Sequence, residues 1–413
     1  MNKILLSHPN GNANVRGVLN GLKVHDMLQS FHTSVACFSG TYMDTLANLP
    51  LLHDFRRRTY ASDVRKLTHT YPFNELGRMV AQKVKLKTFL THETGIFCTH
   101  KCTKYIDHKV ASYISKHNDI TAVYAYEDGA LETFRAAKLY GIKCIYDLPI
   151  GYWQAMHRML SEEREKNPEW TITLGGFNDS EEKLQRKDEE LSLSDIIFVA
   201  SSFTKETLKE YPGKLPEIKV IPYGFPNTNA ERKYMSFSNI KKIKLLYVGG
   251  LSQRKGISYL FEAIKGLEQY CELTVVGSGN INSCPVLKKE LNMHKYIPSL
   301  PHSEILKLMS EHDVLIFPSL FEGFGLVVTE AMSQGTPVIT TERTCGPDII
   351  VNGENGWLVD AGSCIALRQR IEEIITHPEL IKMAGQAAME TAKSRPWNIY
   401  GEETIRAIKE LLK

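Results

Sequence analysis

The sequence lacks several features that would assign it to well-known classes of protein. No apolar run is long enough to span a bilayer, and the apolar start of the chain turns polar at Ser7, which leaves no hydrophobic core for a signal peptide. The eight cysteines form no Cys-x-x-Cys pair, so they indicate no disulfide framework. We therefore expect a protein of the cytoplasm, with reduced cysteines.

Several common site signatures are also missing. There is no Gly-x-x-x-x-Gly-Lys-[Ser/Thr] phosphate loop and no Gly-x-Ser-x-Gly nucleophile turn. Five potential metal ligands lie close together in the sequence, but without the spacing typical of zinc sites: His92, Cys98, His100, Cys102 and His108. The sequence thus predicts no metal site and no resident cofactor.

The composition is that of an ordinary globular protein, with 43% hydrophobic and 23% charged residues. A chain of 413 residues is too long for one ordinary core and predicts two domains. The net charge is only +3, but residues 51–120 hold 13 Lys/Arg against 6 Asp/Glu. That basic segment could meet an anionic partner, and a solvated helical surface is the alternative.

Short apolar or β-branched runs alternate with helical patterns in both halves of the chain. This alternation is typical of parallel sheets with right-handed crossovers. We therefore predict an α/β protein with two Rossmann-like domains that face each other across a cleft. The predicted strands are Lys3–Ser7, Val35–Phe38, Ala122–Ala125, Lys143–Tyr146 and Asp195–Val199, then Lys244–Val248, Glu272–Val276, Asp313–Pro318 and Pro337–Thr341.

The domain boundary is predicted from a polar stretch with little periodicity. The polar stretch that follows Ile221 carries Pro, Gly and Asn, so residues 1–226 are predicted to form the first domain, residues 227–239 a linker and residues 240–395 the second domain. Residues 396–413 form a last helix, which could pack back on the first domain.

The strongest functional signal is the segment from Phe317 to Ile339. A buried strand is followed by a loop with Gly323 and Gly325 and then by a helix that begins near Leu326. Glycines allow backbone N–H groups to approach a ligand, and a helix start adds unpaired donors and partial positive charge. This pattern predicts a phosphate seat. Glu322 and Glu330 flank it and could accept hydrogen bonds from a sugar and a ribose.

A second loop has matching chemistry. The strand that ends near Val248 runs into Gly249 and then into Arg254 and Lys255 at the head of a helix. Two cations at a helix start would neutralise a diphosphate. Gly277, after the next strand, belongs to a weak Gly-x-Gly pattern that would border the same cleft.

These segments resemble a known family. The Glu322-x7-Glu330 spacing, with LSQRKG, ASSFTKETL and IPYGF, is similar to the GT-B retaining glycosyltransferases of family four. The resemblance implies that Lys255 and Arg254 hold the donor diphosphate, that Glu322 meets the transferred sugar and that Glu330 binds the ribose. It also implies donor contacts from the backbone around Gly323, Phe324, Gly325 and Leu326. Many relatives have Arg where Gly250 stands, so one phosphate contact is lost or taken over by Arg254.

In the first domain, four residues after the first strand are candidates for the acceptor side, because relatives carry a flexible loop there: Asn10, Gly11, Asn12 and Asn14. An ordinary Asn/Gly turn is the alternative.

Tyr126 stands where many relatives have a histidine beside the reacting sugar, so that role cannot be transferred. The neighbouring Glu127 and Asp128 become the candidates for orienting the sugar or accepting a proton. Asp147 ends the next strand and is predicted to point toward the cleft, with a helix or turn cap as the alternative.

The function predicted from these residues is transfer of a sugar from a nucleotide-diphosphate sugar to an acceptor hydroxyl. Retention of configuration and glycan or glycolipid biosynthesis follow from the resemblance. The chain has no Asp-x-Asp pair, the metal-diphosphate clamp of the other large glycosyltransferase fold, so we expect catalysis without a metal. The alternatives are a sugar phosphorylase or epimerase on the same fold, and an inactive nucleotide-sugar-binding scaffold.

The acceptor is expected to be a glycan, a lipid-linked glycan or a small molecule, and not nucleic acid, because no interleaved basic and aromatic motif is present. Between Arg56 and Lys116 three apolar residues alternate with lysines: Val80, Val84 and Leu86 with Lys83, Lys85 and Lys87. This pattern predicts an interfacial helix or flexible arm that could dock on anionic lipid at the inner face of the membrane. A solvated face is the alternative.

Overall fold

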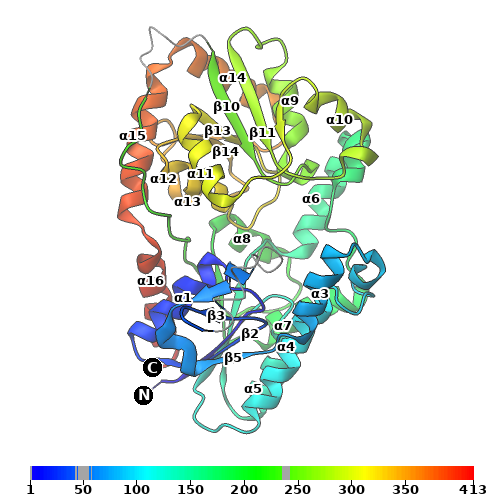
Figure 1. Cartoon of the computed structure of the whole chain (residues 1–413), viewed down its shortest axis with the longest axis vertical. Coiled ribbons are helices and arrows are strands. Elements are labelled where there is room, and N and C mark those ends of the chain that lie inside the picture. Colours follow the sequence, from blue (N-terminus) through cyan, green and yellow to red (C-terminus); the bar gives the residue numbers. More distant parts are fainter. Residues whose placement is uncertain (1, 42–43, 45–54, 57, 235–241) are drawn as a thin grey trace.

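The computed structural model describes residues 2–41, 44, 55–56, 58–234 and 242–413. They form two α/β domains stacked along the long axis of the molecule, with both ends of the chain on the amino-terminal domain (Figure 1). Each domain is built around a parallel sheet. The prediction of an α/β protein with two Rossmann-like domains is therefore confirmed.

The amino-terminal sheet has seven parallel strands, and its central strands are buried on both faces, as helix-covered parallel sheets require. In spatial order they are β5 (Thr68–Thr70), β2 (Leu28–Thr33), β1 (Ile4–Ser7), β6 (Ala122–Tyr126), β7 (Lys143–Leu148), β8 (Ile196–Val199) and β9 (Glu217–Val220). A separate pair, β3 (Cys37–Phe38) and β4 (Thr59–Tyr60), forms a small parallel ribbon.

Helices cover this sheet and also extend from it toward the second domain (Figure 1). The α-helices are α1 (Ala13–Val24), α3 (Phe73–Lys83), α4 (Thr99–Ile114), α5 (Leu131–Leu139), α6 (Trp153–Lys166), α7 (Glu181–Leu193) and α8 (Ser202–Thr207). Short 3-10 turns are η2 (Ser62–Leu67), η3 (Lys87–Leu90), η4 (Pro168–Thr173) and η5 (Leu208–Glu210).

The carboxyl-terminal sheet has six parallel strands around a core of Leu, Ile and Val. In spatial order they are β12 (Lys295–Ile297), β11 (Cys271–Val276), β10 (Ile243–Val248), β13 (Val314–Phe317), β14 (Val338–Thr341) and β15 (Trp357–Val359). The helical elements are η7 (Gln253–Lys255), α9 (Ile257–Ile264), η8 (Ile281–Ser283), α10 (Pro285–Leu291), α11 (His302–Glu311), α12 (Leu326–Ser333), α13 (Gly346–Ile349), α14 (Cys364–Thr376), α15 (Glu379–Ser394) and α16 (Trp397–Leu411).

The chain crosses between the domains in two adjacent segments. Phe225 pairs with Pro396, and the Phe225 N–H donates to the Arg395 carbonyl at 2.9 Å. After the second crossing α16 packs against α1, where the backbones approach closely at Gly21 and Gly401. The last helix thus belongs to the core of the first domain (Figure 1).

The described part of the predicted linker, residues 227–234, packs on the carboxyl-terminal domain. The Asn229 N–H donates to the Ser333 carbonyl, the Arg232 guanidinium to the His312 carbonyl, and the Tyr234 hydroxyl to a glycine carbonyl that follows α12. Residues 235–239 of the predicted linker lie outside the described residues.

One predicted strand of the first sheet was wrong. The strand next to β1 is β2, and the predicted run Val35–Phe38 contributes only the two-residue β3 of the small ribbon. The sequence did not predict β2, because Ser30 and His32 are polar, although both are buried. Hydrogen bonds between the His32 ring and the Ser30 and Tyr71 hydroxyls satisfy these groups within the core.

Candidate functional site

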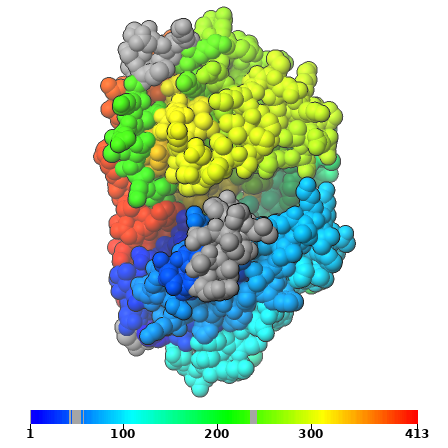
Figure 2. All heavy atoms as spheres, in the orientation of Figure 1, coloured from blue at the N-terminus to red at the C-terminus, as the bar shows by residue number. Residues whose placement is uncertain are grey.

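A cavity of about 400 Å³ lies between the two domains and is lined by residues of both. In the space-filling view a recess separates the surface of the carboxyl-terminal domain from that of the amino-terminal domain (Figure 2). The cavity lies beyond the carboxyl ends of β1, β6, β10 and β13, where parallel sheets bind ligands.

The phosphate seat predicted around α12 borders this cavity. Gly325 is the residue before the helix and has φ of 92°, a left-handed conformation that favours glycine. Phe324, Gly325 and Leu326 all line the cavity, so the first N–H groups of α12 lie at its wall. Glu330, one turn further along, also lines it, and its Oε1 is 2.9 Å from His302 Nε2.

Lys255 and Glu322 form an ion pair at the bottom of the seat. Both line the cavity, and their side chains are 14% and 15% exposed. The Lys255 ammonium also lies over the Phe317 ring, 5.1 Å from its centroid. Burial and, after it, the positive charge of Arg254 lower the pKa of Lys255. The lysine charge is therefore stabilised best when an anion is in contact with it.

Arg254 lies beside the pair but does not line the cavity. Its Nη1 donates to the Phe321 carbonyl at 2.7 Å and is 3.6 Å from Glu322 Oε2. Arg254 therefore affects the phosphate seat indirectly, by attracting the Glu322 carboxylate and by lowering the pKa of Lys255. Gly250, where many relatives have Arg, lies on the cavity wall, and Arg254 does not reach into that position.

The remaining glycines of the predicted donor site divide into two groups. Gly249 lines the cavity, whereas Gly277 lies directly behind it, where a Cβ would be 1.8 Å from the Gly249 carbonyl oxygen. Gly323 faces the other domain: a Cβ there would be 1.8 Å from the Pro149 carbonyl oxygen, so only glycine fits. The Gly323 carbonyl accepts hydrogen bonds from the Ser201 and Thr204 hydroxyls at 2.6 and 2.9 Å. Gly277 and Gly323 thus shape the site without lining it.

The amino-terminal domain presents uncharged polar groups to the cavity. Asn12 and Asn14, at the start of α1, line it, and Asn14 Nδ2 donates to the Tyr223 hydroxyl at 3.3 Å. Asn12 is the N-cap residue of α1, yet its side chain makes no capping hydrogen bond. Its amide therefore remains available to a ligand in the cavity.

His8 is a cavity residue that the sequence reasoning did not select. It lines the cavity beside Tyr126, with ring centroids 4.7 Å apart, and its Nδ1 accepts from the Asn10 N–H at 2.9 Å. Burial lowers the pKa of His8 to about 4, so the ring is neutral near pH 7 and its Nε2 carries the proton. His8 stands in the loop after the first strand, next to the asparagines that were predicted as candidates, so its position was a usable signal. Tyr223 was also missed.

The structure places Glu127 and Asp128 away from the cavity. Neither lines the cavity: Glu127 lies 3.6 Å from Lys187 Nζ and Asp128 lies 3.5 Å from Lys183 Nζ, so both carboxylates face α7. The chain turns away from the cleft at Asp128, which has φ of 69°. We therefore assign them no role in orienting the sugar or accepting a proton.

Asp147 also lies below the cavity and does not line it. It is 2% exposed, its Oδ2 accepts from the Tyr124 hydroxyl at 2.7 Å, and it caps no helix. Burial raises the pKa of Asp147 to about 7, although the hydrogen bond from the Tyr124 hydroxyl lowers it. Its position supports the floor under Tyr126.

Asn10 and Gly11 line a second, smaller cavity next to the first, to which Asn12 also contributes. A Cβ at Gly11 would overlap the Tyr60 ring, so the loop is closely packed on that residue. The loop of residues 10–12 therefore separates two adjoining cavities.

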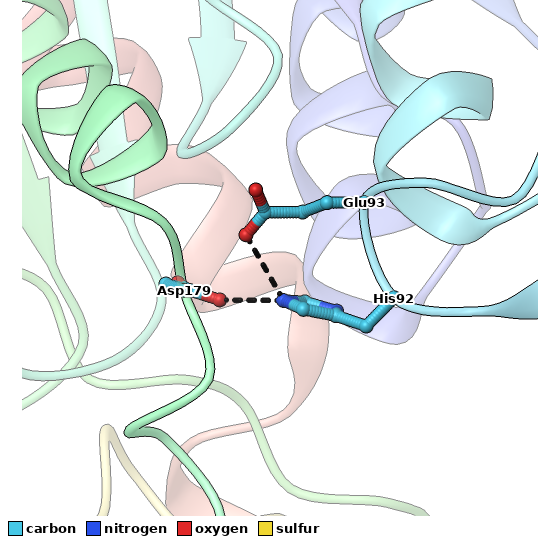
Figure 3. Close-up of side chains that lie close together, drawn as sticks. All are labelled: His92, Glu93 and Asp179. Carbon is cyan, nitrogen blue, oxygen red and sulfur yellow. Dashed lines mark hydrogen bonds and ion pairs between the residues drawn. The ribbon is translucent and has the colours of Figure 1, made fainter.

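One group of metal-ligand side chains occurs among the described residues. His92 Nε2 lies 2.9 Å from Asp179 Oδ1 and 3.1 Å from Glu93 Oε1 (Figure 3). Asp179 also pairs with Lys183 and Lys187, and Ser180 donates to Glu93. These carboxylates already have cationic or hydrogen-bonding partners, so the cluster is better described as an ion-pair network at the start of α7. Cys98 and Cys102 are buried elsewhere, and the expectation of metal-free catalysis stays a prediction.

Residues 231–391 match the family described as glycosyl transferases group 1. This range covers nearly the whole carboxyl-terminal domain, including Lys255, Glu322 and Glu330.

Two curated relatives are similar to about half of the chain. An uncharacterized glycosyltransferase of Methanocaldococcus jannaschii is 30% identical over 207 residues, which is 49% of this chain and 56% of that protein. The capsular polysaccharide biosynthesis glycosyltransferase CapM of Staphylococcus aureus is 28% identical over 232 residues, 52% of this chain and 60% of that protein. The alignments thus span little more than half the length of these relatives.

A solved structure extends the similarity of fold to the whole chain. HepE of Anabaena, in complex with UDP and glucose, superimposes with a TM-score of 0.62 at 17% identity, covering 99% of this chain and 100% of that one. At this identity the likeness concerns the fold alone. Within the described residues, none of the helices has both the length and the apolar character of a membrane span.

Proposed function

From the group 1 match of its carboxyl-terminal domain, we infer that this chain is a glycosyltransferase that moves a sugar from a nucleotide-diphosphate sugar to an acceptor hydroxyl. The observation that carries the proposal is the cavity between the domains, where a lysine, two glutamates and the start of a helix meet neutral groups of the first domain. CapM, which is named for capsular polysaccharide biosynthesis, supports a role in making a glycan or glycolipid.

The donor binds on the carboxyl-terminal side. Its diphosphate replaces Glu322 as the partner of Lys255 and accepts hydrogen bonds from the first N–H groups of α12. Glu322, once released, is free to accept hydrogen bonds from the transferred sugar, and Glu330 to accept them from the ribose. In this exchange the donor diphosphate, and later the leaving group, stabilises the charged form of Lys255.

Transfer retains the configuration of the sugar, because the diphosphate leaves and the acceptor hydroxyl enters on the same face of the sugar ring. Of the residues that line the cavity, the carboxylates are Glu322 and Glu330, and both belong to the donor side. We therefore assign the acceptor proton to an oxygen of the departing diphosphate, whose charge Lys255 stabilises. His8 Nε2–H donates a hydrogen bond to a sugar hydroxyl, since its ring is neutral and its Nδ1 is held by Asn10.

A panel of nucleoside diphosphates and their sugars tests the proposal by thermal shift, because a ligand that binds only the folded state raises the melting temperature by mass action. UDP is the first nucleotide to test, since HepE holds UDP. Release of free nucleotide in the presence of candidate acceptors then reports transfer. If no nucleoside diphosphate shifts the melting temperature and no sugar is released, the proposed function is wrong.

Peripheral docking on an anionic membrane is a further part of the proposal. Phe73, Leu76 and Val80 form an exposed stripe along α3, and exposed Val84, Leu86 and Phe89 follow it. Lys83, Lys85 and Lys87 are exposed among them. The helix ends at Lys83 and Lys85 has φ of 58°, so of the two predicted forms, an interfacial helix or a flexible arm, the basic run is not a continuous helix but a turn at the end of α3. Arg57 and residues 51–54 of the basic segment lie outside the described residues.

Apolar side chains surrounded by lysines suit the interface of an anionic bilayer, at about 1 kcal/mol for each basic residue near the surface. We expect co-sedimentation with phosphatidylglycerol vesicles at low salt and loss of it when Lys83, Lys85 and Lys87 are replaced by Gln. The matched control replaces three exposed lysines of the carboxyl-terminal domain: Lys265, Lys288 and Lys289. Equal sedimentation of both triple variants would exclude docking through α3.

A further inference from the structure

A second cavity of about 280 Å³ adjoins the proposed transfer site. The loop of residues 10–12 forms one wall and Arg58, Arg78 and Gln82 form the other, with Met79 beside them. Asn12 also lines the larger cavity, so the two spaces meet at its side chain. A molecule that fills the smaller cavity can therefore extend toward the seat of the donor sugar.

Two arginines line this cavity, and the carboxylate of Glu75, which does not line it, pairs with both. Glu75 is 3% exposed and hydrogen-bonds both arginines: Arg78 donates through Nε and Nη2 at 2.8 and 2.5 Å, and Arg58 donates through Nη2. Although burial opposes ionisation, the hydrogen bonds and charges of Arg78 and Arg58 hold the pKa of Glu75 below its ordinary value. The trio thus keeps a net positive charge in a largely buried place, since the arginine side chains are only 12% and 19% exposed.

Two residues that line this cavity each have a buried polar atom without a hydrogen-bond partner among the described residues: Arg58 Nη1 and Asn10 Oδ1. One is a charged donor and the other is an acceptor. Leaving such groups unpaired in a folded protein costs about 1–3 kcal/mol each, and more for a charged group. A ligand that offers an anionic oxygen to Arg58 and a hydroxyl to Asn10 satisfies both.

We propose that this cavity binds an oxyanion, a phosphate or carboxylate group, carried by the acceptor, and that the acceptor is therefore an anionic sugar or polyol. The inference rests on the proposed function for the reaction, but the binding of the oxyanion can be measured separately. Glu75 holds the two guanidinium planes in place and limits the charge of the empty cavity. Asn12, between the two spaces, is positioned to contact the part of the acceptor that reaches the donor sugar.

Binding of inorganic phosphate and of acetate, measured by calorimetry, tests the cavity directly. The measurements use a Lys255→Ala background, so that the donor seat does not contribute. Loss of one charged hydrogen bond should weaken phosphate binding about tenfold or more in Arg58→Gln. Arg65→Gln is the matched control, because Arg65 is an exposed arginine of η2 that does not line the cavity, and it should leave affinity unchanged.

Glu75→Gln distinguishes a binding role from a purely structural one. Removing the competing negative charge should tighten phosphate binding several-fold, the opposite of what general loosening of the fold would give. Arg58→Lys keeps the charge but loses the Nη1 donor, so it should bind with intermediate affinity if Arg58→Gln does not fold. Preferential binding of phosphate or of acetate identifies which oxyanion the acceptor carries.

Equal phosphate affinity in the Lys255→Ala background with and without Arg58→Gln, or no phosphate binding at all, would overturn the inference. With an acceptor panel, Arg58→Gln should raise KM for phosphorylated or uronic acceptors and leave KM for the donor unchanged. If the enzyme binds and cleaves a nucleotide sugar but glycosylates only neutral acceptors, this inference is wrong and the proposed function stands. If no nucleotide binds although phosphate does, the proposed function is wrong and the cavity keeps its ligand.

Discussion

The two domains place ionic groups near the carboxyl edges of their sheets in different ways. In the carboxyl-terminal domain, Lys255, Glu322 and Glu330 line the cavity. In the amino-terminal domain the acidic residues after β6 turn away from the cavity and pair with Lys183 and Lys187 of α7. The difference shows that a carboxylate following a buried strand is not sufficient evidence of a site, because the next backbone turn decides where it points.

The amino-terminal ions have a structural role instead. Glu190 accepts hydrogen bonds from the N–H groups of Asp128, Ala130 and Leu131 and also from the Tyr146 hydroxyl. It therefore caps the start of α5 and fixes the turn that carries Asp128 away from the cavity. The residues of this domain that line the larger cavity are neutral, which suits hydroxyl groups of a sugar more than a diphosphate.

Breaking the amino-terminal ion cluster should give the largest effect. Glu190→Ala removes the partner of three N–H groups and one of the two carboxylates beside the buried Arg186, which keeps Asp107, so we expect a loss of about 3–5 kcal/mol in the free energy of unfolding. Urea unfolding measures it. Glu189→Ala is the control, because its pair with Arg135 is exposed and should contribute only about 0–1 kcal/mol. Similar losses in both variants would contradict the structural role.

Much of the fold could be read from the sequence because parallel strands are runs of buried apolar residues, as in β10 and β13. The seat around Gly325 was predictable for a similar reason: a glycine, a helix start and flanking carboxylates are local features. The amino-terminal side was not, since the direction of Glu127 and Asp128 depends on Asp128 φ and on α7, which lies far along the chain. The pairing of Glu75 with Arg58 likewise joins residues whose proximity only the tertiary fold sets.

On the donor side, removing charge should affect binding and not folding. Lys255→Ala and Glu330→Ala should each weaken nucleotide-sugar affinity by about 1.5–3 kcal/mol, because each removes a charged hydrogen-bonding group from the cavity. Calorimetric titration of both variants checks this, with Lys205→Ala, an exposed lysine of α8, as the control. Unchanged affinity in both variants would remove the proposed seat and with it the contrast between the domains.

The pH dependence of stability sharpens the comparison within the first domain. The pKa of Asp147 is raised by burial to about 7, above its value of about 3.9 in an unfolded chain. Its contribution to stability is therefore fully present below about pH 4 and is lost as the pH rises through about 7.

Asp147→Asn should flatten this decline, because the amide oxygen can still accept from the Tyr124 hydroxyl but no longer ionises. Urea midpoints for both proteins at several pH values between about 4.5 and about 8 measure the two slopes. Parallel slopes would show that Asp147 titrates as it does in the unfolded chain.

The smallest effect is expected from chelation. If Lys255 and the start of α12 neutralise the leaving diphosphate, transfer should continue at an unchanged rate in excess EDTA. If EDTA abolishes activity and magnesium or manganese restores it, Lys255 and the start of α12 do not neutralise the donor diphosphate by themselves.

The position of α16 has a consequence for the order in which the protein can mature during synthesis. The face of α1 around Gly17 and Gly21 is covered by Tyr400, Gly401 and Ile405, which the ribosome makes almost four hundred residues later. Until then the first domain has its sheet but lacks α16. The apolar face of α1 therefore stays uncovered until the second domain has been made. Although it is first in the sequence, the amino-terminal domain is therefore the last to be completed.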